Sequence, residues 1–137
     1  MAFGDKAIDY VERKLAGMVA LMQNLAGHAE SEMKMNAPWR DRTGHARAGL
    51  HAGVEVKKNE FVLFLAHSMD YGAALEKGTP PHMIRPRNKK ALYWPGANHP
   101  VKRVRHPGTK AYSIVRPTAE EYKVRLRKTV ADWWGDK

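Results

Sequence analysis

Apolar residues recur at every third or fourth position through the first part of the chain, which is the spacing of one face of an α-helix. The pattern predicts a helix over about residues 5–35, capped by Asp5 and ended by Asn36 and Pro38. Such a helix spans about 45 Å, more than a small core needs, so part of it is expected to serve a neighbour. We interpret it as a helix lying across a sheet, with a coiled coil as the alternative. The stripe consists of Ile8, Val11, Leu15, Met18, Met22, Leu25 and Ala29, widened by Val19, Ala26 and Met33.

The pattern then changes to an alternation of apolar and polar residues. Residues 50–56 alternate strictly, which predicts a strand with one buried face. A polar turn at residues 58–60 leads into residues 61–66, a continuous apolar run that predicts a more fully buried strand. Together they predict a β-hairpin over about residues 49–66.

Two further helices are predicted. Asp70 is placed to cap a short one over residues 71–77. Near the C-terminus, Thr118 and Glu121 stand at the spacing of a capping box, and apolar residues follow at helical intervals. These signals predict a helix over about residues 119–134.

The order of these elements predicts the fold class. Between the last two helices only residues 91–94 and 101–105 have the composition of short strands. We therefore expect an α+β fold in which the long N-terminal helix and the C-terminal helix pack on an antiparallel sheet, with a long basic loop over residues 77–116. The 137 residues, 43% of them hydrophobic, suit a single domain covering 1–137.

The positive charge of the chain is concentrated in one segment. The net charge is +10, from 24 Lys and Arg against 14 Asp and Glu. Residues 77–116, the basic segment, contain ten of these cations, six of the eight prolines and no acidic residue, so the remaining 14 cations balance the 14 acids. Because prolines remove backbone donors and like charges repel, we expect that this segment does not readily fold on itself and forms an extended arm or a long loop with short strands inside it. Polyanions or acidic protein surfaces are its expected neighbours.

The residue inventory excludes several kinds of chemistry. The chain has no cysteine, which excludes disulfides, thiolate zinc sites and cysteine nucleophiles. The run His28-Ala-Glu30-Ser-Glu32 lacks the two-histidine spacing of a zinc protease, and His28 and Glu32, four residues apart, are interpreted as part of a solvated helix face. Neither a phosphate-binding glycine loop nor a serine nucleophile motif occurs. We predict no catalytic residue, no cofactor, no metal and, without an apolar run of about 18 residues, no membrane contact.

Aromatic residues occur among the cations of the basic segment, as they do in nucleic-acid-binding surfaces. These residues are Tyr93, Trp94 and Tyr112. The other interpretation is a solvated arm whose rings belong to the core, and the sequence leaves both open. The remaining tryptophans are expected to serve packing or an interface; they are Trp39, Trp133 and Trp134.

Five short blocks follow one another between residues 36 and 118. They are Asn36-Ala-Pro38 with Thr43-Gly44 and Arg47; Tyr71-Gly-Ala-Ala-Leu-Glu76-Lys-Gly78-Thr79; His82-Met-Ile84-Arg-Pro86; Ala91-Leu-Tyr-Trp94; and His106-Pro-Gly-Thr-Lys110 with Arg116-Pro117. In this order the chain resembles the gene-product-ten-like family of small virion proteins of long-tailed bacteriophages. Members of that family are neck, head-to-tail connector or tail-completion proteins. The chain departs from the family at Tyr112-Ser-Ile-Val115, where members often have an apolar Pro-Phe-Leu run.

The resemblance implies a non-enzymatic structural virion protein that forms a homo-oligomeric ring, six- or twelve-fold, at the head-to-tail junction and completes or joins the tail. Implied partners are connector or stopper proteins, tail-tube or tail-terminator proteins, and DNA in transit. The implied location is the neck or tail of the virion and, during assembly, the host cytoplasm. A free basic nucleic-acid-binding module is the alternative, and a small nuclease is disfavoured by the residue inventory.

The expected working residues follow from the basic segment and the matched blocks. Those expected to face an interface or DNA are Arg85, Arg87, Lys89, Lys90, Lys102, Arg103, Arg105, His106, Lys110 and Arg116. Those expected to shape the loop are Gly78, Thr79, Pro86, Pro107 and Gly108. Glu76, surrounded by cations, is expected to form an ion pair with Arg47 or with another subunit.

Overall fold

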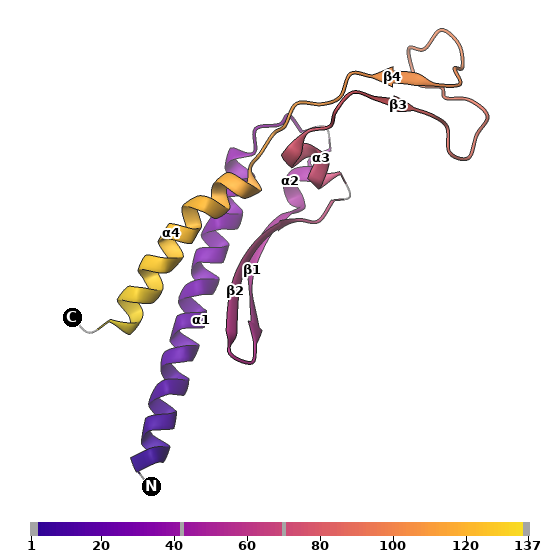
Figure 1. Ribbon diagram of the computed structural model, residues 1–137. Coiled ribbons are helices and arrows are strands. Elements are labelled where there is room, and N and C mark those ends of the chain that lie inside the picture. The colour runs from indigo at the N-terminus through magenta and orange to yellow at the C-terminus, as the bar shows by residue number, and fades with distance from the viewer. Residues whose placement is uncertain (1–2, 42, 70, 136–137) are drawn as a thin grey trace.

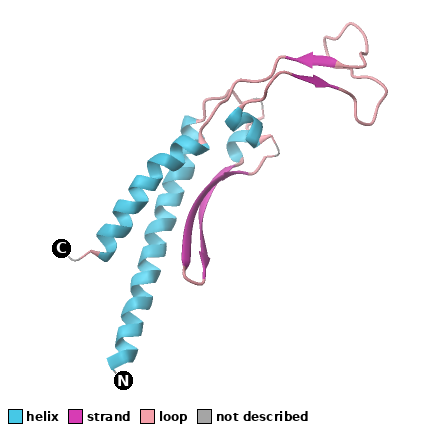
Figure 2. Cartoon of the chain, in the orientation of Figure 1, coloured by secondary structure: helices cyan, strands magenta, loops and turns pink. Residues whose placement is uncertain are grey.

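The computed structural model describes residues 3–41, 43–69 and 71–135. In chain order its elements are α1 (Phe3–Asn36), α2 (His45–Ala48), β1 (Leu50–Lys57), β2 (Glu60–His67), α3 (Gly72–Lys77), β3 (His82–Ile84), β4 (Val104–His106) and α4 (Val115–Trp134). The body is elongated, with α1, α4 and the β1–β2 hairpin side by side, and a slender arm projects from one end (Figures 1 and 2). The predicted α+β class is confirmed. The residue expected to cap α3, Asp70, lies outside the described residues.

Helix α1 buries the later part of its apolar stripe and exposes the beginning. Its buried residues are Met18, Met22, Ala26, Ala29 and Met33. Ile8 and Val11, from the same stripe, are 58% and 46% exposed. Asp5 lies inside the first turn of α1 rather than at its cap, so that detail of the prediction is wrong. Within the described residues, no helix combines the length and apolar character needed to cross a membrane.

Helices α1 and α4 run antiparallel and are joined near the C-terminal end of α4 (Figure 1). The indole N–H of Trp133 donates to the carbonyl of Lys14 over 2.7 Å, and the Lys14 ammonium donates to the carbonyl of Trp133 over 2.7 Å. Gly17 makes room for the indole, because a Cβ at that position would stand 2.2 Å from the ring. The Trp134 indole donates to the sulfur of Met18 over 3.2 Å. Both tryptophans therefore pack against α1.

The β1–β2 hairpin is a two-stranded sheet, with its register running from Leu50↔His67 to Lys57↔Glu60 around the turn at Lys58 and Asn59. Its inner face packs on α1, and Leu50 is fully buried. The expectation that residues 61–66 are more fully buried is wrong, since Val62 and Phe64 are 38% and 36% exposed. A hairpin has only two strands, and the helices cover one of its faces.

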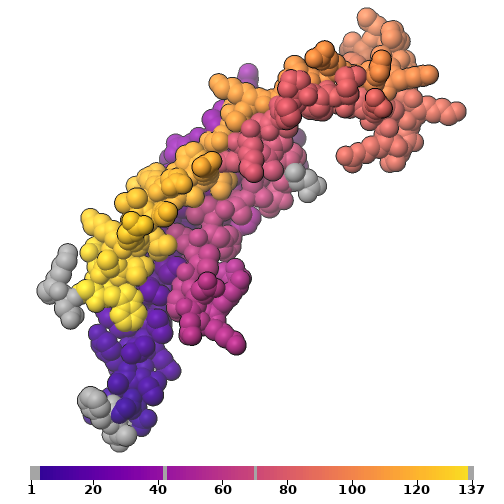
Figure 3. Space-filling view, viewed as in Figure 1, coloured from indigo at the N-terminus to yellow at the C-terminus, as the bar shows by residue number. Residues whose placement is uncertain are grey.

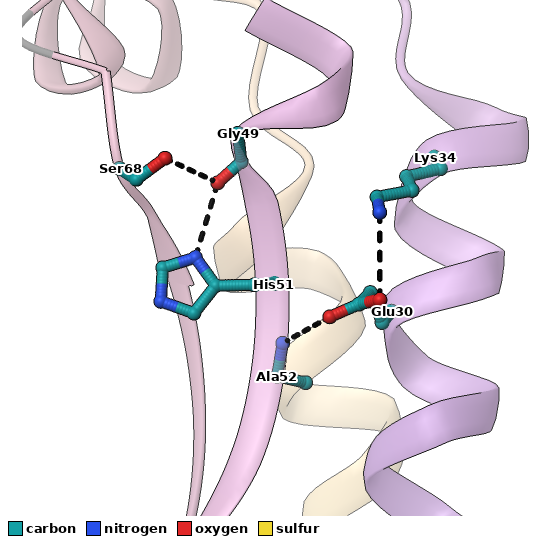
Figure 4. A network of polar contacts seen from close by, with 6 residues as sticks. All are labelled: Glu30, Lys34, Gly49, His51, Ala52 and Ser68. Atoms are coloured by element: carbon teal, nitrogen blue, oxygen red, sulfur yellow. Dashed lines mark hydrogen bonds and ion pairs between the residues drawn. The ribbon is translucent and has the colours of Figure 1, made fainter.

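A carboxylate on α1 holds the base of the hairpin (Figure 4). Glu30 accepts a hydrogen bond of 3.1 Å from the backbone N–H of Ala52 and forms a 3.4 Å ion pair with Lys34. The N–H of Ala52 is the larger cause of the lowered pKa of Glu30. On the other side of β1, the carbonyl of Gly49 accepts from Ser68. Glu30 thus attaches the hairpin to α1.

The core lies where α1 ends and α4 begins. It is formed by Met33, Trp39, Leu50 and Ile114, which come from α1, the loop after it, β1 and the residue before α4. Because these four residues come from separate parts of the chain, this cluster joins the two helices to the hairpin.

His67 lies against this core and supports a prediction about pH. Its ring centroid is 5.9 Å from that of Trp39, and burial lowers its pKa although Glu76 partly opposes the shift. The unfolded chain binds a proton at this histidine near pH 6.5, whereas the folded chain does so only at lower pH. The free energy of unfolding is therefore expected to fall as the pH drops below about 6.5. Urea unfolding across this range measures the effect. His67→Phe should flatten it, and a flat profile for the unmodified protein would contradict the prediction.

Candidate interface on the basic arm

The arm comprises residues 79–109 and is a long, narrow hairpin rather than an open loop. Strands β3 and β4 pair antiparallel from His82↔His106 to Ile84↔Val104. Farther out, Leu92 and Val101 form a single bridge with backbone hydrogen bonds of 2.7 and 2.9 Å. The expected strand at residues 91–94 is therefore absent, and only Leu92 pairs there. The strand expected at residues 101–105 is shifted to β4, Val104–His106.

The arm also corrects the expectation that the basic segment does not fold on itself. Its prolines lie outside β3 and β4, so the paired positions keep their backbone donors. Its cations extend into solvent, where repulsion between them is screened. Pairing of the two legs is therefore compatible with the charge.

Close backbone contacts fix the root of the arm. Thr79 and Thr109 exchange two backbone hydrogen bonds of 3.0 Å, and their hydroxyl oxygens lie 2.9 Å apart. Gly78 and Gly108 have φ values of +75° and +88°. A Cβ at Gly78 would stand 2.6 Å from the carbonyl oxygen of Thr109, and one at Gly108 would stand 2.3 Å from that of Thr79. Only glycine allows the two legs to approach this closely.

A stack of two histidines continues the root into the strands. The rings of His82 and His106 lie 4.9 Å apart, and the Nδ1 atom of His106 accepts from the N–H of Gly108 over 3.0 Å. Pro107 lies between His106 and Gly108, and its ring fixes the backbone φ angle at this position. The side chain of His106, one of the residues expected at the interface, is thus engaged within the arm itself.

Glu76 joins α3 to the start of α4, and the ion pair expected between Glu76 and Arg47 does not form. Its carboxylate accepts hydrogen bonds from the backbone N–H groups of Ile114, Val115 and Arg116 at 2.9, 3.1 and 2.8 Å. These N–H groups open α4, where no side chain at the N-cap residue itself forms a capping bond. Arg47 instead forms an ion pair with Asp41 at 2.8 Å.

This cap also explains why α4 begins at Val115 and not at residue 119. Thr118 and Glu121 do not form the predicted capping box: Thr118 is buried inside the helix, and Glu121 pairs with Arg125 at 2.9 Å. Pro117 is compatible with the earlier start because a proline in the first helical turn removes no intrahelical hydrogen bond.

Replacing Glu76 by Gln is expected to lower the free energy of unfolding by about 1–2 kcal/mol, because an amide offers one uncharged acceptor where three N–H groups now meet a carboxylate. Glu120→Gln is the matched control, since it removes the same charge at an exposed position of α4 and should change stability by less than about 0.5 kcal/mol. Urea unfolding of both variants measures the difference. Equal effects would show that the charge, rather than the cap, is responsible.

The cations of the basic segment are all exposed, and none has an ion-pair partner among the residues that the structure describes. Those on the arm are Arg85, Arg87, Lys89, Lys90, Lys102, Arg103 and Arg105. Lys110 lies just past the root and Arg116 in the first turn of α4, so these two are separated from the others by the root. Pro86 follows β3 and is half-buried.

An apolar hollow lies among these cations. It is lined by Ile84, Leu92, Tyr93, Trp94 and Val104. Tyr93 and Trp94 are 67% and 44% exposed, so these rings lie outside the core. Tyr112, 37% exposed, lies at the root, where its N–H donates to the carbonyl of Leu75. Sequence patterns do not reveal the hollow, because it forms only when Leu92 pairs with Val101 and the two legs of the arm come together.

The arm can bind anions and apolar groups through cations and exposed rings. In the described part of the chain, no group of three or more His, Asp or Glu side chains is arranged to hold a metal ion. A comparison with known proteins finds no matching family model, curated protein or solved structure.

Limited trypsin digestion is expected to cut the arm before either terminal helix. The arm's cations are exposed, and few backbone hydrogen bonds join its legs. Arg127 and Lys128 are exposed on α4 and serve as an internal control, because a helix must open before its backbone is cleaved. Mass spectrometry of the earliest fragments identifies the first site. Early loss of α1 would argue against an accessible arm.

Proposed function

We propose that this chain is a non-enzymatic structural protein of long-tailed bacteriophage virions that forms a ring in the neck, at the head-to-tail junction, and completes or joins the tail. The ordered blocks between residues 36 and 118 support this proposal through their resemblance to the gene-product-ten-like family. The proposed ring is six- or twelve-fold. Its partners are connector or stopper proteins on one side and tail-tube or tail-terminator proteins on the other.

The observation that carries the proposal is the arm. It projects from a root at which the Thr79–Thr109 bridge joins its two legs and Glu76 caps α4 (Figure 1). It presents seven exposed cations that have no ion-pair partner in the described residues. A surface of this kind meets its counter-charges on another molecule. In a neck, those charges belong to an adjoining protein ring or to the DNA that passes through.

Charge on such an arm acts mainly on docking. Opposed charges speed encounter and fix the register of two surfaces, while the apolar contact beneath them supplies affinity. An assembly component needs both properties, because each copy must join its neighbours in one orientation. The apolar hollow among the cations provides the apolar contact that gives affinity.

Electron microscopy of the purified protein mixed with connector complexes tests the proposal. The expected result is one added ring of density on the tail-facing side of the connector. Connector particles without added density at saturating protein would contradict it. The same grids show whether the protein alone forms rings.

The second candidate function is a free nucleic-acid-binding module, favoured by the exposed rings of Tyr93 and Trp94 beside cations. It predicts a monomer whose affinity for DNA falls steeply as salt concentration rises. Fluorescence anisotropy over a salt series, together with the mass in solution, distinguishes it from the ring protein. Weak DNA binding with an added ring on connectors would exclude the free module.

A further inference from the structure

We propose that the arm of one copy docks on the N-terminal turns of α1 in the next copy, so that successive copies join head to tail. This inference rests on the proposed function, because it names the contact that would build the ring. Two exposed surfaces carry it, and they lie at opposite ends of the molecule (Figure 3).

The first surface is the part of α1 that extends beyond the end of α4 (Figure 1). The last turn of α4 meets α1 at Lys14, through the hydrogen bonds with Trp133. Ile8 and Val11 lie on the turns before that point. They are 58% and 46% exposed although they continue the stripe that is buried from Met18 onward. These free turns therefore present an apolar ridge that no other part of the described chain covers.

A row of carboxylates borders this ridge. Asp5, Asp9 and Glu12 stand four and three residues apart, which places them on one face of the helix beside Ile8. All three are exposed, and none has an ion-pair partner in the described residues. Arg13 uses its guanidinium on the backbone carbonyl of Asp9 and leaves the carboxylate free of that contact.

The second surface is the hollow of the arm, which has the complementary chemistry. Its apolar lining includes Ile84 and Trp94. It shares Leu92 and Tyr93 with an adjoining hollow whose lining includes the cations Arg87 and Lys89. An apolar hollow with a cationic border matches an apolar ridge with an anionic border, both in the groups that lose water and in the sign of the charges.

The contact must join two copies, because the arm and the free turns of α1 lie too far apart to meet within one chain (Figures 1 and 3). A contact between two different surfaces of the same protein is heterologous. It repeats from copy to copy and closes into a ring when the rotation per copy divides a full turn.

Disulfide trapping tests the contact directly, because the chain contains no cysteine to interfere. An Ile8→Cys variant is mixed with a Tyr93→Cys variant, with and without prior nuclease treatment, and mild oxidation is followed on a non-reducing gel. Val124→Cys, 66% exposed on α4, replaces Tyr93→Cys in the control mixture. We expect the arm pair to cross-link at least about tenfold faster than the control pair, because docking raises the effective thiol concentration. Equal rates would overturn the inference.

Charge exchange provides a second measurement. Asp9→Lys with Glu12→Lys in the helix partner, or Arg87→Glu with Lys89→Glu in the arm partner, should each slow the cross-link several-fold. Combining the two reversed partners should restore it. Slowing without restoration would overturn the pairing of these two surfaces. All these positions are exposed, and circular dichroism checks that each variant is folded; Ala7→Cys, also exposed, replaces Ile8→Cys should that variant fail to fold.

The outcomes separate this inference from the function on which it rests. A ring on connector particles without arm cross-linking would leave the proposed function standing and overturn the inference. Cross-linking without a ring on connectors would support head-to-tail association and contradict the role in the neck. A cross-link that disappears after nuclease treatment would show that the arm binds nucleic acid, and it would overturn the direct contact.

Discussion

Replacing Met33 by Asp is expected to leave the protein unfolded. Met33 is fully buried in the cluster that joins α1, the hairpin and the start of α4. The substitution removes the packing of a large side chain and buries a carboxylate with no partner, at a cost of roughly 5 kcal/mol or more. The total stability of a domain is only about 5–15 kcal/mol. Far-UV circular dichroism and a thermal scan should therefore show little helix and no cooperative transition.

The matched control lies two residues away on the same helix. Met35 is 79% exposed, so Met35→Asp changes the same pair of residue types without burying a charge. Its free energy of unfolding should stay within about 0.5 kcal/mol of the unmodified protein. A folded Met33→Asp protein that fails only in assembly would move this part of α1 from the core to an interface.

Helical periodicity predicts the long elements of this protein because the side chains that follow it face a continuous surface. From Met18 to Met33 the stripe is buried, apart from Val19 and Leu25, which are half-buried. The same stripe continues to Ile8 without being covered, since α4 ends near Lys14. A stripe shows which face of a helix is apolar, whereas its coverage depends on the length of the elements that pack on it.

Contacts between distant positions account for most of what the sequence does not predict. The cap of α4 comes from Glu76, some 40 residues before the helix, while the local pair Thr118 and Glu121 offers a competing capping signal. Each arm strand has three residues, too few for an alternation to be recognised, and pairing depends on a bridge from Thr79 to Thr109. The apolar run of residues 61–66 suggests burial on both faces, but its sheet has a single partner strand.

The candidate interface likewise has one feature that the sequence predicts and one that it does not. The exposure of its cations follows from their charge alone, because Lys and Arg are seldom buried without a partner. The hollow beside them requires Ile84, Leu92 and Val104 to meet, and only the folded arm brings them together. The sequence thus predicts the positive charge of this surface but not its shape.

Reversing Lys102, Arg103 and Arg105 to Glu is expected to leave the melting temperature nearly unchanged and to give particles whose heads and tails do not join stably. The three side chains are exposed on the returning leg of the arm, so folding gains little from them. In an assembled neck they would meet acidic residues of a neighbouring copy or ring, or the phosphates of DNA. Like charges at such a contact slow docking and disfavour its register. Infectivity and electron microscopy of the particles measure the defect.

A second triple variant distinguishes the effect of the arm cations from the effect of the net charge. Reversing Lys58, Lys123 and Lys128 lowers the net charge from +10 to the same +4, at exposed positions away from the arm. Because long-range attraction depends on net charge while register depends on the contact, only the arm variant should abolish joining. Normal infectivity and intact joints in the arm variant would show that these three cations are not needed to join heads to tails. Thermal unfolding is measured on both proteins, since unjoined heads and tails implicate the arm only when the variant that causes them is folded.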